Sequence, residues 1–142
     1  MPVPFWAGHY IGLSFRDHGR DRIGVDCWGL VRLIMAEQFS IALPSLSKSY
    51  KHSTDVDGIS QLINDETQYW APVTPGDEKL GDVIVLRVRG KPMHVGLVLG
   101  DQQMLHVEYG INSTIERYKS PRWADRICGF YRYISGLQHA HT

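Results

Sequence analysis

Three residues of this 142-residue sequence carry the side chains needed for nucleophilic catalysis: Cys27, His94 and His106. A cysteine thiol attacks a carbonyl carbon once a neighbouring base has taken its proton, and imidazole is a common base. A second imidazole can hold the first in the correct tautomer through a hydrogen bond to its other nitrogen. A lone buried cysteine is more often structural, so the hypothesis requires a fold that brings the three side chains together.

Cys27 is expected in the first turn of a helix. Asp26 can accept hydrogen bonds from the free backbone N–H groups of that turn, so it is the predicted N-cap. Apolar residues recur three, four and seven positions after Cys27, which places the thiol on the face that packs into the core. The positive end of the helix dipole favours a thiolate there, and the N–H of Cys27 could donate to an oxyanion.

His94 and His106 are expected on the two neighbouring strands of a β-hairpin. Side chains alternate between faces, so the histidines share a face only if the loop between the strands has an odd number of residues. A three-residue loop at 100–102, with Leu99 opposite Gln103, is the example we expect. A two-residue loop at 101–102 would place them on opposite faces. In the odd register they are diagonal neighbours, roughly 7 Å apart at their Cα atoms.

Two other uses of these residues stay open at this point. Cys27, His94 and His106 could form a zinc site, for which Glu108 is the one apparent fourth ligand. A disulfide between Cys27 and Cys128 would consume the nucleophile. Two cysteines without a CxxC pair exclude a disulfide framework and give no sign of structural zinc. No cofactor is expected unless the zinc site just described forms.

The hydrophobic periodicity changes from helical to alternating along the chain, which predicts an α+β fold with helices packed on an antiparallel β-meander. The length fits a single domain over residues 1–142. The stretch at residues 69–79 contains Pro72, Pro75 and Gly76 and is therefore expected to be an extended connection. The expected helices span residues 27–40 and 55–64, and the expected strands span residues 82–88, 94–99, 104–109 and 127–134.

The 15 basic and 15 acidic residues cancel, so no net charge directs the chain toward nucleic acid or an anionic membrane. The sequence shows no signal peptide and no apolar run near the ~20 residues of a membrane helix. We therefore expect synthesis in the cytoplasm without membrane insertion, and release by lysis or within an assembly.

Several motifs, in this order, carry a family resemblance: Val25–Leu30 (VDCWGL), Leu80–Val85 (LGDVIV), Met93–Leu97 (MHVGL) and His106. From about Tyr10 to Tyr133 the chain resembles the NlpC-type papain-like cysteine peptidases of bacterial cell walls. The lead-in at residues 10–13 (YIGL) and the tryptophan of DCWGL are most similar to a compact branch encoded by phages and phage-derived gene transfer particles.

The resemblance implies a papain-like α+β core with Cys27 as nucleophile, His94 as base and His106 as the orienting residue. It implies hydrolysis of amide bonds in peptidoglycan stem peptides, typically between γ-D-glutamate and a diamino acid, without a metal. The implied partners are the stem peptide and the tail-tip or hub proteins of a phage-like particle, with action in the periplasm or cell wall.

The chain departs from the family pattern around the expected oxyanion site. Many members carry a tyrosine twelve residues before the cysteine, where this chain has Phe15, which has no donor. Any hydroxyl donor would then come from Tyr10. Trp28 stands where many relatives carry serine and should reshape the edge of the site. The predicted oxyanion or substrate-lip residues are Tyr10, Phe15, Asp26 and Trp28.

Two alternative functions use the same residues. The chain could be a structural or assembly subunit of a tail tip with little turnover. It could also be an acyltransferase, because one Cys/His/His set serves both hydrolysis and transfer.

Overall fold

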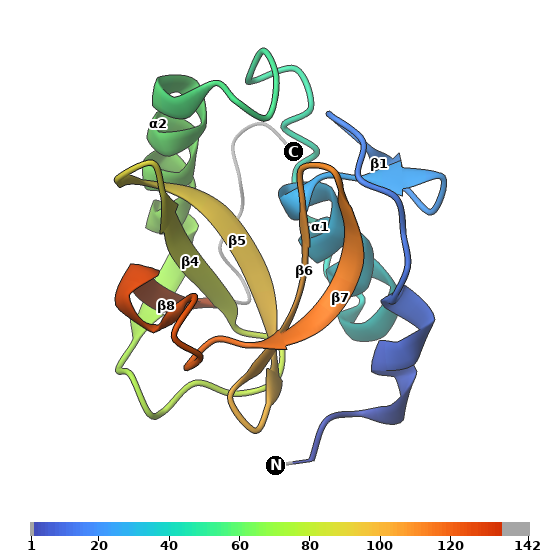
Figure 1. Cartoon of the computed structure of the whole chain (residues 1–142), viewed down its shortest axis with the longest axis vertical. Coiled ribbons are helices and arrows are strands. Elements are labelled where there is room, and N and C mark those ends of the chain that lie inside the picture. Colours follow the sequence, from blue (N-terminus) through green and yellow to red (C-terminus); the bar gives the residue numbers. More distant parts are fainter. Residues whose placement is uncertain (1, 135–142) are drawn as a thin grey trace.

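A computed structural model of the chain describes residues 2–134 (Figure 1). Helices α1 (Cys27–Phe39) and α2 (Val56–Glu66) pack on a six-stranded antiparallel sheet. In spatial order its strands are β3 (Trp70–Val73), β8 (Ile127–Tyr133), β4 (Val83–Val88), β5 (Lys91–Gly100), β6 (Gln103–Glu108) and β7 (Ile111–Arg117). The smaller elements are β1 (Arg20–Asp21), β2 (Gly24–Val25) and the 3₁₀ helices η1 (Phe5–Tyr10), η2 (Thr67–Tyr69) and η3 (Ala124–Arg126).

The α+β fold predicted from the sequence is confirmed, and both helices begin and end within two residues of their predicted bounds. The predicted single domain over residues 1–142 stays a prediction, because residues 135–142 lie outside the described residues. No helix within residues 2–134 combines the length and the apolar character that crossing a membrane requires.

Two strands of the sheet were not predicted. Strand β7 reads INSTIER, which contains too few apolar residues for an alternating pattern, and it forms by pairing with β6. Strand β3 falls in the predicted extended connection and contains Pro72. Because β3 is an edge strand, a residue without an N–H donor is tolerated there.

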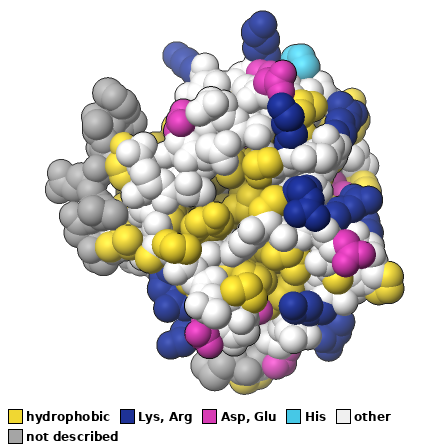
Figure 2. Space-filling view, turned by 90° about the vertical axis from the view of Figure 1, so that its left-hand side faces the viewer, with side chains coloured by type: hydrophobic (Ala, Val, Ile, Leu, Met, Phe, Trp, Pro, Cys, Tyr) yellow, Lys and Arg dark blue, Asp and Glu magenta, His cyan; other side chains and the backbone are white. Residues whose placement is uncertain are grey.

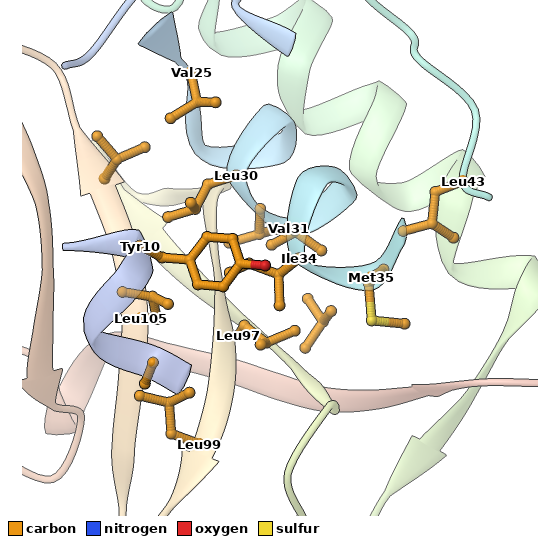
Figure 3. Close-up of a cluster of buried hydrophobic side chains, with 14 of the residues drawn as sticks. Tyr10, Val25, Leu30, Val31, Ile34, Met35, Leu43, Leu97, Leu99 and Leu105 are labelled. Atoms are coloured by element: carbon orange, nitrogen blue, oxygen red, sulfur yellow. The ribbon is translucent and has the colours of Figure 1, made fainter. Parts of the chain in front are cut away.

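The sheet separates two apolar clusters. On the helix side, Leu30 and Ile34 of α1 pack against a set that includes Leu97 and Leu105, and the ring of Tyr10 lies in the same cluster (Figure 3). The opposite face is covered by the segment that follows β7, and its cluster contains Ile84, Leu86, Val98, Met104, Tyr118, Trp123 and Phe130. Even-numbered residues of β5 and β6 face this second cluster, so both histidines belong to that side of the sheet.

The β5–β6 hairpin reaches the expected register by an unexpected route. Its turn consists of two residues, Asp101 and Gln102, and not of the three predicted. Both have positive φ angles, 51° and 59°, as a tight hairpin turn requires. A β-bulge just before Gly100 adds one residue, so that Leu97 still pairs with Leu105. The two histidines therefore share a face, as predicted.

The sheet opens between β5 and β6 beyond that pair. None of the β5–β6 pairs among the described residues lies further from the turn than Leu97 and Leu105. From there His94 and Val95 pair only toward β4, while His106 pairs toward β7. The two strands diverge in Figure 1, and α1 contacts both of them. This opening is where a side chain from the helix can approach the histidine side of the sheet.

Helix α1 begins very close to the β1–β2 hairpin at Gly29. A Cβ atom at this position would lie 1.9 Å from the carbonyl oxygen of Gly19, inside any contact distance. The glycine of the DCWGL motif thus allows the helix start and the preceding loop to pack together.

Replacing Gly29 with alanine is therefore expected to lower the free energy of unfolding by about 3 kcal/mol, because the added Cβ forces the helix and the loop apart. Urea unfolding followed by circular dichroism measures this change. Gly8→Ala is the matched control, since a Cβ there meets nothing within 4 Å. Equal stability of the two variants would contradict the close packing.

Candidate active site

The start of α1 is held by the buried carboxylate of Asp26. Oδ1 accepts the Gly29 N–H at 2.8 Å, which confirms the predicted N-cap, and pairs with Arg20 at 2.7 Å. Oδ2 accepts the His18 N–H at 3.1 Å and the Tyr50 hydroxyl. Asp26 was predicted as a lip residue, and it borders the pocket described below. Its oxygens are engaged by these donors, so it fixes the helix start and offers little to a substrate.

The Cys27 thiol is half-buried at the start of α1. Burial, followed by the Asp26 carboxylate, raises its pKa to about 12, although the N–H groups of Val95 and Trp28 act in the opposite direction. The expectation that the helix dipole favours a thiolate is therefore contradicted, because desolvation outweighs it. Cys27 and Cys128 are both free thiols, so the disulfide alternative is excluded.

The two imidazoles form a buried hydrogen-bonded chain. Nε2 of His94 lies 2.8 Å from Nδ1 of His106, and Nε2 of His106 lies 2.9 Å from a carboxylate oxygen of Glu116. The ring of Trp123 stacks on His94 with centroids 5.5 Å apart and planes 20° apart. These contacts leave Nδ1 of His94 as the nitrogen available to Cys27.

Both imidazoles are neutral at neutral pH. Burial lowers the pKa of His94 to about 3, with smaller contributions from His106 and the Arg122 cation. Burial also lowers the pKa of His106, although its hydrogen bond to Glu116 acts in the opposite direction. The resting site therefore holds an uncharged thiol beside an uncharged base.

Cys27 and His94 line the same pocket, which has a volume of about 250 Å³. The thiol approaches from the helix side and the imidazole from the opposite side. Both line the pocket where β5 and β6 diverge, and the Val95 N–H is directed at the Cys27 sulfur. Most of the wall is apolar and includes Ile59, Leu62, Ile63, Trp70, Val85 and Met93. The side of the molecule that carries α2 and β4 shows a band of hydrophobic side chains (Figure 2).

Trp28 and Phe15 border the pocket, and their role as lip residues stays a prediction. The Trp28 indole N–H donates to the Pro44 carbonyl at 2.9 Å, and its ring meets Trp70 edge-on. The Phe15 ring packs edge-on against Tyr109 with centroids 5.4 Å apart. Neither side chain offers a free donor to an oxyanion, so both act on the shape of the pocket.

Tyr10 was predicted as a lip or oxyanion residue, and this prediction is wrong. Its ring is fully buried in the core between η1 and α1 (Figure 3). Its hydroxyl donates to Glu37 at 2.7 Å and accepts from Gln38 at 2.9 Å. Both partners lie near the end of α1, about 15 Å from its start by helical rise. The apolar packing of the ring fixes the hydroxyl at that distant position.

The sequence of this chain matches a known protein family. Residues 12–132 match the sequence pattern of the NlpC/P60 family. The chain belongs to the NlpC/P60 family.

Two bacterial proteins are among the relatives of this chain. The chain is 24% identical over 124 residues to the Escherichia coli (strain K12) protein named murein DD-endopeptidase MepS/murein LD-carboxypeptidase, covering 87% of this chain and 57% of that protein. It is 26% identical over 115 residues to a probable endopeptidase NlpC homolog of Haemophilus influenzae, covering 81% and 52%. The chain thus spans little more than half the length of these relatives.

Solved structures of the family share the fold. An NlpC/P60 family protein from Bacillus cereus superposes with a TM-score of 0.68 at 20% identity, covering 93% of this chain and 41% of that one. The NlpC/p60 domain of the peptidoglycan hydrolase SagA superposes with a TM-score of 0.60 at 21% identity, covering 90% and 92%. A papain-like α+β core of the NlpC type is therefore the fold of this chain.

Glu116 and Trp123 belong to the site of this NlpC/P60 chain but were not found from the sequence. Glu116 lies on β7, which was not predicted because this strand contains few apolar residues. The Tyr109–Gly110 pair after β6 was the available signal, because a glycine turn after a strand predicts a hairpin and so a partner strand beside His106. Trp123 lies outside any regular strand, and only the tertiary fold places it on His94.

One group of metal-competent donors occurs among residues 2–134. His106, Glu108 and Glu116 offer ligand atoms within 4.8 Å of one another. Arg122 bonds to both carboxylates and lies 3.1 Å from Glu116, so their charge is already compensated. The zinc alternative that included Cys27 is not formed, since both ring nitrogens of His106 have hydrogen-bond partners within the protein.

The buried neutral histidines predict a loss of stability in acid. The pKa of His94 is about 3 in the folded chain and near 6.5 when unfolded, so below about pH 6.5 only the unfolded state binds the proton. The free energy of unfolding should then fall by up to ~1.4 kcal/mol per pH unit on acidification. Urea unfolding between pH 7 and about 4 measures the slope.

His94→Gln should show a shallower slope than the wild type, because it lacks the buried group that must be protonated. His9→Gln, at an exposed position, serves as the control and should keep the wild-type slope. Identical slopes for both variants would show that His94 is not the buried neutral base.

Proposed function

We propose that this chain is a cysteine endopeptidase that hydrolyses amide bonds in the stem peptides of peptidoglycan. The observation that carries the proposal is the Cys27 thiol and the His94 imidazole in one pocket, with His94 hydrogen-bonded to His106. Relatives named as a murein endopeptidase and as a peptidoglycan hydrolase support this substrate class.

In this mechanism Nδ1 of His94 takes the thiol proton as the Cys27 sulfur attacks the amide carbonyl. The carbon–sulfur bond forms, and the carbonyl oxygen becomes an oxyanion. The carbon–nitrogen bond then breaks, and the leaving amine receives the proton from His94. Water hydrolyses the thioester, again through His94, which releases the carboxylate and restores the thiol.

Because the resting pair is uncharged, proton transfer accompanies attack on the substrate. The substrate carbonyl then binds next to the Cys27 thiol, in a pocket with little water, and His94 is already positioned to accept the thiol proton. The oxyanion would be stabilised by the backbone N–H of Cys27 at the helix start. Phe15 and Tyr10 contribute no donor to it.

The expected scissile bond joins γ-D-glutamate to the diamino acid, as the resemblance to NlpC-type peptidases implies. Trp28 and the apolar wall of the pocket determine which neighbouring groups fit beside that bond. Mass spectrometry of the released fragments identifies the bond directly.

Replacing Cys27 with alanine should reduce the release of stem-peptide fragments from purified sacculi by at least about 1,000-fold, because the nucleophile is lost. Cys128→Ala is the matched control, since it removes the other, exposed thiol and should retain full activity. Equal release by wild type and Cys27→Ala would refute the proposal. If fragments are recovered joined to an added amine, and not with a free carboxylate, the reaction is acyl transfer.

We also propose that the enzyme acts from a phage-like tail, with tail-tip or hub proteins as partners and the periplasm or cell wall as its place of action. The support is the resemblance of the YIGL lead-in and of Trp28 to tail-associated members. The alternative is a structural tail-tip subunit with little turnover.

Particles that carry Cys27→Ala should assemble in normal numbers but deliver DNA with at least about 10-fold lower efficiency, since loss of the thiol removes only catalysis. Electron microscopy and transduction assays measure the two quantities, with Cys128→Ala as control. Failed assembly of the Cys27→Ala particle would favour the structural role.

A further inference from the structure

We propose that Glu116 is a positioning residue that fixes the protons on both imidazoles, so that Nδ1 of His94 is free of hydrogen and ready to accept the thiol proton. This inference rests on the proposed function, because it assigns Glu116 a role in that reaction. Glu116 does not touch the thiol and acts only through the two histidines.

The direction of each hydrogen bond in the series His94–His106–Glu116 follows from its last member, Glu116. An ionised carboxylate can only accept, so Nε2 of His106, 2.9 Å from Glu116, must carry the hydrogen. In a neutral ring Nδ1 of His106 is then an acceptor, and it takes its hydrogen from Nε2 of His94 at 2.8 Å. Nδ1 of His94 is therefore unprotonated. One carboxylate thus determines the tautomer of a base two hydrogen bonds away.

The structure keeps Glu116 ionised. Burial alone would raise its pKa, but the indole N–H of Trp123, the hydrogen bond from His106 and the Arg122 guanidinium lower it overall. The Trp123 N–H faces the carboxylate without a hydrogen bond of normal geometry. Arg122 reaches both oxygens of Glu116, at 3.1 and 3.2 Å. Glu116 therefore remains a group that can only accept hydrogen bonds from His106.

The same residues also hold the rings in place. Arg122 lies over the Trp123 ring at 4.5 Å from its centroid, and Trp123 stacks on His94. Arg122 pairs in addition with Glu108, whose carboxylate lies within 4.8 Å of a His106 ring nitrogen but makes no hydrogen bond to either imidazole within residues 2–134. Glu108 and Glu116 therefore share a cation, but only Glu116 is hydrogen-bonded to His106. This difference supplies a matched control.

The Glu116→Gln substitution removes the restriction, because an amide can donate as well as accept. When the amide donates to Nε2 of His106, the hydrogen moves to Nδ1 of that ring. His94 must then accept at Nε2 and carry its hydrogen on Nδ1, which is the wrong tautomer for taking the thiol proton. Replacement of the carboxylate also leaves the transient His94 cation without its negative counterpart.

Glu116→Gln should lower kcat on stem-peptide substrate by about 100-fold with little change in KM, by analogy with loss of the orienting carboxylate in a serine-protease triad. Glu108→Gln should keep kcat near the wild-type value, and Glu116→Asp should recover part of the loss because it still only accepts. Equal kcat for Glu116→Gln and Glu108→Gln would overturn the inference.

Tautomers can be read without substrate by ¹⁵N nuclear magnetic resonance of the histidine ring nitrogens at neutral pH. The wild type should show hydrogen on Nε2 of both His94 and His106, and Glu116→Gln should show it on Nδ1 of His94 in a substantial fraction of molecules. A wild-type His94 protonated at Nδ1 would overturn the inference even if Glu116→Gln failed to fold.

The two proposals fail separately. If Cys27→Ala releases as many stem-peptide fragments as the wild type, the proposed function is refuted while the tautomer assignment can still hold. If Cys27→Ala is inactive but Glu116→Gln retains both the wild-type tautomer and kcat, the function stands and the role of Glu116 is refuted.

Discussion

The position of the Cys27 sulfur depends on the buried carboxylate of Asp26. That carboxylate caps α1 through Gly29 and binds Arg20 of β1 and Tyr50 of the segment after α1, so the helix start is tied to segments on both sides of it in the sequence. A capping hydrogen bond typically contributes about 1 kcal/mol, and a buried ion pair adds directional constraint more than net stability. The constraint matters because the first turn of the helix must enter the opening between β5 and β6.

A second constraint is the dryness of the site. Burial raises the pKa of Cys27 and lowers that of His94, so the resting pair is uncharged. The same burial strengthens the hydrogen bond between His94 and His106, since both imidazoles are shielded from water. The direction of the hydrogen bonds in the series His94–His106–Glu116 therefore determines which nitrogen of His94 can accept the thiol proton. The site does not depend on a preformed ion pair.

The apolar pocket and the polar chain lie on opposite sides of the base. Trp28 and the α2 side chains shape the space in front of the thiol, whereas Trp123, Glu116 and Arg122 support the imidazoles from behind. Substitutions in the first set would change which substrates fit. Substitutions in the second set would change how the base is held, with the pocket left intact.

The sequence by itself determined the local features of the site. Asp26 before Cys27 predicted the capped helix, and the spacing of His94 and His106 predicted their shared face, because both follow from short-range periodicity. The expected three-residue turn was wrong, since a bulge beside Gly100 can restore register without any marked sequence signal.

Only the tertiary structure decided the remaining features. It placed Tyr10 in the core, removed the thiolate preference of Cys27, and brought Glu116 to His106. Each of these results depends on burial or on contacts between side chains that local periodicity does not encode. For Glu116, the Tyr109–Gly110 turn indicated only that a partner strand follows β6. The sequence thus identifies the thiol and the two imidazoles. The tertiary structure determines their protonation and the residues that hold them, because it determines which groups are buried away from water.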